Sequence, residues 1–209
     1  VYLYESDPTL TNVTISGNTS IWGGGMYLYE SDPTLTNVTI SGNTAEGSGG
    51  GMLLYVSDPI LTNVTISGNT ADGSGGGMYC EYIANPILLN TIIAGNESNE
   101  IEFYSEAVSS TITISYSNIE GGQDSIVTND NGTVTWGSGN IDVDPMFVDS
   151  ANGNYHLLAT SQLINAGHPD STDSDGTVAD MGAYPYLNSY SGPTWYITES
   201  GNDTTGTGA

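Results

Sequence analysis

The first hundred residues repeat one segment with a nearly constant period. VYLYESDPTLTNVTISGN, MYLYESDPTLTNVTISGN and MLLYVSDPILTNVTISGN begin at residues 1, 26 and 52. The matching prolines of successive copies, Pro8, Pro33, Pro59 and Pro86, are separated by 25, 26 and 27 residues. Each copy contains short runs of alternating apolar and polar residues, punctuated by Gly, Asn and Pro, a pattern typical of strands joined by turns. Stacked units of this length, without a helical period or the dense leucines of leucine-rich repeats, predict an all-β solenoid, a parallel β-helix.

The alternation also predicts which side chains face the interior, because matching residues of successive coils stack about 4.8 Å apart. The expected inward columns are Val1, Met26, Met52, Met78; Leu3, Leu28, Leu54, Cys80; Leu10, Leu35, Leu61, Leu88; Val13, Val38, Val64; and Ile15, Ile40, Ile66. Two structural asparagine columns are expected, Asn12, Asn37, Asn63, Asn90 and Asn18, Asn43, Asn69, Asn96. Stacked amides of this kind hydrogen-bond from coil to coil.

The charge of the chain is entirely acidic. Its 209 residues include 24 Asp and Glu and no Lys or Arg, which gives a net charge of −24. This charge repels nucleic acid and anionic membranes, so we expect neither as a partner. No stretch approaches the roughly 20 apolar residues that span a bilayer, so we expect no direct membrane insertion. The single cysteine, Cys80, excludes an intrachain disulfide and is interpreted as an apolar core residue.

Two segments resemble known families. VTISGNTADGSGGGM is similar to the repeats of right-handed parallel β-helix surface proteins and to polymorphic outer-membrane repeats. Residues 140–186 resemble the C-terminal end of secreted β-helix proteins of the choice-of-anchor type. The resemblance implies a right-handed solenoid with coils of about 25–27 residues, located outside the cell or on the surface of a prokaryote. We therefore expect β-helix coils over residues 1–147, a closing segment over 148–189, and a linker or opening strand over 190–209.

The sequence argues against catalysis. Polysaccharide lyases of this fold resemble one another in using Lys or Arg as base and charge neutraliser, and this chain has neither. A glycoside hydrolase needs two carboxylates about 5–9.5 Å apart. The acidic residues of the repeat, such as Glu5 and Glu30, recur from coil to coil, which favours a solvated face over a unique active site. We expect that the protein is not an enzyme.

One acidic loop is a candidate metal site. The stretch DSTDSDGTVAD places Asp170, Asp173, Asp175 and Asp180 around a glycine, and oxygen ligands spaced in this way are typical of calcium-binding loops. The loop departs from the EF-hand pattern because no Glu closes it. Calcium is the one cofactor that the sequence indicates, and a solvated acidic turn is the alternative.

Tyrosines recur on the outward face of the repeat. Tyr2, Tyr27 and Tyr79 form one column and Tyr4, Tyr29 and Tyr55 form another. Rows of exposed rings can stack on sugars or pack against another chain. A cross-strand aromatic ladder without a ligand is the alternative.

The ends of the chain predict self-association. Val1, Leu3 and Leu10 lie in a first coil with no polar cap, and Trp195, Tyr196 and Ile197 resemble the opening strand of another β-helix. Pairing of such ends would join subunits head to tail into a filament. The sequence thus predicts a non-catalytic extracellular structural or adhesive solenoid, a fibre or stalk subunit. The alternative is a carbohydrate-binding or remnant lyase-like module of a secreted enzyme, with polysaccharide as its partner.

Overall fold

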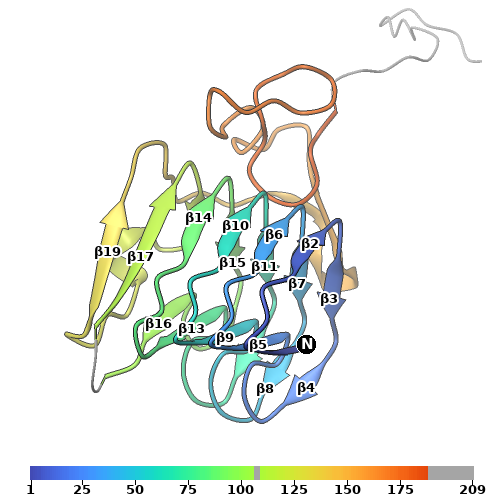
Figure 1. Ribbon diagram of the computed structural model, residues 1–209. Helices are drawn as coiled ribbons and strands as arrows, with labels where there is room; N and C mark the ends of the chain where they lie inside the picture. Colours follow the sequence, from blue (N-terminus) through green and yellow to red (C-terminus); the bar gives the residue numbers. More distant parts are fainter. Residues whose placement is uncertain (106–108, 188–209) are drawn as a thin grey trace, which may run out of the picture.

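The computed structural model describes residues 1–105 and 109–187, which form a parallel β-solenoid (Figure 1). Sheet A contains β1 (Tyr2–Tyr4), β5 (Met26–Tyr29), β9 (Met52–Tyr55), β13 (Met78–Glu81) and β16 (Ile101–Phe103). Sheet B contains β2 (Thr9–Thr11), β6 (Thr34–Thr36), β10 (Ile60–Thr62), β14 (Ile87–Leu89), β17 (Ser110–Ser115) and β19 (Gly132–Trp136). Sheet C contains β3 (Thr14–Ser16), β7 (Thr39–Ser41), β11 (Thr65–Ser67), β15 (Ile92–Ala94) and β18 (Asn118–Ile119). Sheet D is short and contains β4 (Thr19–Ser20), β8 (Thr44–Ala45) and β12 (Thr70–Ala71).

The strands pair in the register that the repeat predicts. Met26 lies opposite Met52, and Met52 opposite Met78. The inward columns are confirmed from the second coil onward, where Leu28, Leu54, Leu35 and Leu61 are fully buried; in the first coil, Leu3 and Leu10 are partly buried. Val1 differs from the expectation, because it precedes β1 and is 54% exposed. The fold is therefore all-β, with one core running along the solenoid axis.

Cys80 lies in this core, as expected. It is 1% exposed and occupies the place of Leu54 one coil earlier. Burial raises the pKa of its thiol, so the reactive thiolate is disfavoured and the residue acts as an apolar filler.

Both asparagine columns form hydrogen-bonded ladders. The outer ladder turns the chain between sheets B and C, with each Asn in a left-handed conformation, and the Nδ2 of Asn37, Asn63 and Asn90 donates to the preceding Asn at 3.2, 3.2 and 3.0 Å. In the inner ladder, Asn43 and Asn69 are fully buried, and the Nδ2 of each donates to the next Asn at 2.9 Å. These amides satisfy buried backbone groups that would otherwise lack partners.

The inner ladder ends where sheet D ends. After β12 the turn is shortened, and Ile101 pairs with Met78, which places Glu100 where the preceding coil has Gly77. The Glu100 carboxylate accepts hydrogen bonds from both the backbone N and the Nδ2 of Asn96. A buried carboxylate thus terminates the amide ladder.

Residues 142–187, which we call the strap, lie along the outside of the solenoid (Figure 1). The strap contains an antiparallel pair, β20 (Phe147–Asp149) and β21 (Asn154–Leu157), and the 3-10 turn η2 (Ser150–Asn152); a second 3-10 turn, η1 (Gln123–Ser125), precedes β19. The backbone N of Gly182 donates to Asn90 O at 2.7 Å, and that of Ala183 donates to Thr65 Oγ1 at 3.0 Å. Leu157, Leu163 and Met181 form a second apolar cluster with Ile92 of sheet C. The strap therefore covers a sheet face that the repeat alone leaves open.

Candidate functional site

A ladder of five tyrosine rings follows the edge of sheet A. The ring centroids of Tyr4 and Tyr29 are 5.2 Å apart and those of Tyr29 and Tyr55 are 4.8 Å apart, with planes within 13° of parallel. The ladder continues through Tyr82 and Tyr104, at 4.9 and 5.5 Å. Stacking at these distances is favourable for aromatic pairs.

Tyr82 enters the ladder through a local insertion. In the register of the strands, Glu81 and not Tyr82 lies opposite Tyr55. Tyr82 and Ile83 then both adopt left-handed conformations, and Val56 N donates to the carbonyls of both Glu81 and Tyr82. This bulge turns the Tyr82 ring onto Tyr55 and leaves Glu81 facing outward beside it. Neither Tyr82 nor Tyr104 was predicted from the sequence; the signal for Tyr82 was the extra residue in the fourth repeat, and Tyr104 directly follows Phe103, which pairs with Cys80.

The second tyrosine column lies beside this ladder and is more buried. Tyr2 and Tyr27 are 5.2 Å apart, Leu53 follows, and Tyr79 comes next in register. Tyr79 is only 9% exposed, so this column is more deeply set than the ladder.

A groove of about 510 Å³ lies over this column. Its lining residues are Trp22, Tyr27, Ser48, Leu53, Tyr55, Tyr79, Glu81, Tyr82 and Tyr104. Trp22 and Ser48 come from the glycine-rich turns that lead into sheet A. Gly47 makes room for the indole, because a Cβ there would lie 2.3 Å from Trp22 Cζ3. Trp22 was not predicted as a site residue, although IWGGGM carries the one tryptophan within the first four repeats. We call this feature the aromatic groove.

Glu81 supplies the charge of the aromatic groove. Its side chain is half-buried, and burial raises the pKa of its carboxyl above the usual value. Burial also raises the pKa of the Tyr79 phenol, and the negative charge of Glu81 raises it further. The groove is therefore an aromatic surface with a single lining carboxylate.

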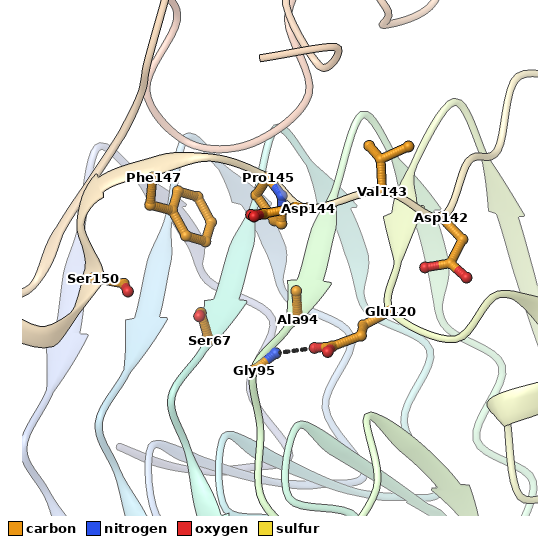
Figure 2. A pocket seen from close by; sticks show the side chains of 10 residues that line it. All are labelled: Ser67, Ala94, Gly95, Glu120, Asp142, Val143, Asp144, Pro145, Phe147 and Ser150. Atoms are coloured by element: carbon orange, nitrogen blue, oxygen red, sulfur yellow. Dashed lines mark hydrogen bonds between the residues drawn. The ribbon is translucent and has the colours of Figure 1, made fainter. Parts of the chain in front are cut away.

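A second cavity, of about 500 Å³, lies between the strap and sheet C (Figure 2). Glu120, Asp142 and Asp144 line it, but each carboxylate accepts a backbone hydrogen bond: from Gly95 at 2.6 Å, from Gly121 at 3.0 Å and from Met146 at 2.8 Å. These carboxylates hold turns together.

Three of the four aspartates of the predicted calcium loop, Asp173, Asp175 and Asp180, lie close enough for their charges to interact, but each has its own hydrogen-bond partners. Asp180 is 2% exposed, and its carboxylate accepts hydrogen bonds from the backbone N of Asn165 and of Tyr186. Asp173 accepts from the backbone N of Asp180, Asp175 accepts from Thr177, and Asp170 is exposed. Within residues 1–105 and 109–187, no three Asp, Glu, His or Cys side chains form a group that could hold a metal ion. Calcium binding by this loop stays a prediction.

Only some of the residues predicted for assembly belong to the part of the chain that the structure describes. Val1, Leu3 and Leu10 lie together at one end of the solenoid, where Leu3 and Leu10 pack against the core. Trp195, Tyr196 and Ile197 lie outside the described residues. Head-to-tail assembly therefore stays a prediction.

Comparison with known proteins identifies the class. The family model for the right-handed β-helix region matches residues 1–148, so the chain belongs to this family. No curated protein and no solved structure matches the chain significantly. Within the described residues, no helix is long and apolar enough to cross a bilayer.

Proposed function

We propose that the chain is a non-catalytic extracellular solenoid that binds a polysaccharide in the aromatic groove and so acts as an adhesive module. The observation that carries the proposal is the concentration of six aromatic side chains around one groove. Sugar rings present apolar C–H faces that pack on aromatic rings, and a hollow lined by aromatic side chains together with polar groups is typical of a ligand site.

The orientation of the rings supports binding here over the rest of the ladder. Tyr4, Tyr29 and Tyr55 cover one another's faces, because their planes are nearly parallel. Around the groove, the planes are tilted by 49° between Tyr55 and Tyr82 and by 78° between Tyr79 and Tyr104. Tilted rings leave parts of their faces free for a ligand.

The charges of the groove support a binding role over a catalytic one. Glu102 lies next to Tyr79 in register, but its carboxylate accepts hydrogen bonds from Gly75 N, Asn99 Nδ2 and Asn129 Nδ2. A hydrolase needs two carboxylates. Among the described residues that line the groove, Glu81 is the one carboxylate, so no second free carboxylate is available to it. Lyase chemistry needs a base and a cation, and the chain has no Lys or Arg.

The test is affinity electrophoresis in gels that contain neutral, amine-bearing or uronate polysaccharides. We expect retardation by at least one of them, and we expect Tyr82→Ala and Trp22→Ala to weaken it about three- to tenfold, as an aromatic contact of about 1 kcal/mol implies. Tyr184→Ala is the matched control, because Tyr184 lies on the strap and stacks on His156. Binding unchanged in both groove variants, or release of unsaturated sugars from uronate polymers, would contradict the proposal.

A further inference from the structure

We propose that the aromatic groove binds a cationic amine at Glu81, and hence that its polysaccharide carries free amino groups. This inference rests on the proposed function and adds the chemical class of the ligand.

Glu81 differs from the buried carboxylates of the chain in having no hydrogen-bond donor. Glu102 has three donors, and Glu100 and Asp180 have two each. Among the described residues, none donates to the Glu81 carboxylate, although it is half-buried. Withdrawing a carboxylate from water without a partner is unfavourable, and a bound cation would supply the missing partner.

The surroundings of Glu81 complete a site for an ammonium group. Tyr79 lies two residues before it on β13, and Tyr55 lies opposite it on β9. The Tyr79 and Tyr104 rings are 6.5 Å apart and nearly perpendicular, and Tyr82 lies 5.5 Å from Tyr104. Aromatic rings arranged around a cation attract it through their negative faces, which is how proteins recognise ammonium ligands.

The shape of the groove and the charge of the chain favour a polymer with amines over a polyuronate. The lining residues come from β5, β9, β13 and the segment after β16, so the groove crosses neighbouring strands over roughly 15 Å at about 4.8 Å each. A groove that extends over several coils suits an elongated chain of sugars. The net charge of −24 attracts amino sugars and repels uronates, and the protein has no Lys or Arg of its own to occupy the site.

The experiment is isothermal titration calorimetry with a glucosamine oligomer and with its fully N-acetylated counterpart of equal length. A pH of about 6 to 6.5 keeps the amines largely charged and stays above the usual pKa of a Glu carboxyl, which burial raises at Glu81, and about 0.15 M salt screens long-range attraction to the acidic protein. We expect the free amine form to bind at least tenfold more tightly, and Glu81→Gln to remove this difference. Glu30→Gln is the matched control, because it removes the same charge at an exposed position that does not line the groove. Thermal melting checks that Glu81→Gln is folded.

The outcomes separate the inference from the proposed function. If neutral and amine-bearing oligomers bind equally, or if Glu81→Gln binds the amine form as the wild type does, the inference is wrong and glycan binding stands. If no oligomer or polysaccharide binds, both fail. A lysine-rich peptide that binds more tightly than the glucosamine oligomer, in a manner that depends on Glu81, would show a protein partner and overturn the inference.

Discussion

Glu100 should make the stability of the solenoid depend on pH near neutrality. Its side chain is 8% exposed, at the end of the inner asparagine ladder. Burial raises the pKa of the Glu100 carboxyl from 4.5 to about 7; the hydrogen bonds from Asn96 lower it, and the neighbouring Glu120 carboxylate adds to the rise. The protonated carboxyl can donate to Glu120, which the ionised form cannot.

The sign of the effect follows from the direction of this shift. The folded state binds the proton more tightly than the unfolded state, so the stabilisation is fully present below pH 4.5 and is lost as the pH rises to about 7. A tenfold difference in proton affinity corresponds to about 1.4 kcal/mol, so the free energy of unfolding should fall by about 3 kcal/mol over this range. For a chain of this size, that loss lowers the melting temperature by about 6–12 °C.

Urea unfolding of the wild type and of Glu100→Gln, between pH 5 and pH 8, measures the effect. Glutamine keeps one carbonyl oxygen to accept from Asn96 and loses the second acceptor, but it does not titrate, so this loss is the same at every pH. Repulsion among the other acidic residues affects both proteins alike, so the difference between the two profiles isolates Glu100. We expect the wild type to lose stability relative to Glu100→Gln as the pH rises. Parallel profiles would refute the reasoning.

Two further predictions concern the ladder and the acidic loop. Asn69→Ala should lower the free energy of unfolding by about 2–4 kcal/mol, because it leaves the buried N and Nδ2 of Asn43 without their acceptor; Asn37→Ala, on the more exposed outer ladder, should cost about 1 kcal/mol, and equal losses in urea unfolding would contradict this account. If the aspartate loop binds calcium, as the sequence predicts, a chelator should lower the melting temperature and Asp175→Ala should abolish that difference, since binding to the folded state stabilises it by mass action. A melting temperature unaffected by the chelator at low salt would show that the loop is a solvated turn.

The sequence was sufficient for the repeat core because each coil provides the environment of the next. In a parallel in-register stack, a residue such as Leu54 contacts its counterparts one period away, so alternation within a strand and the 25–27 residue period together place every inward side chain. Pattern and period likewise place both asparagine ladders and the stacked Tyr4, Tyr29 and Tyr55. These features need no information beyond local pattern and period.

The candidate site was only partly predictable, because it depends on departures from the period. One extra residue in the fourth repeat leaves Glu81 opposite Tyr55 in register and brings Tyr82 into the ladder beside it, and Tyr104 follows in the next coil. A shortened turn in the next coil places Glu100 in the position of a glycine. An insertion or deletion can be recognised in the sequence. The backbone bulge that accommodates it, and the side chains that this bulge turns outward, cannot be predicted from the sequence.

The sequence by itself determined the solenoid, its inward columns and its wholly acidic charge, since these follow from periodicity and composition. Only the tertiary structure decided where the strap lies, that Asp173 and Asp180 accept hydrogen bonds from its backbone, and that Trp22, Glu81 and Tyr104 meet in one groove. Those contacts join residues from different coils, or from segments without a repeat, and their placement depends on turn geometry that no periodic pattern encodes.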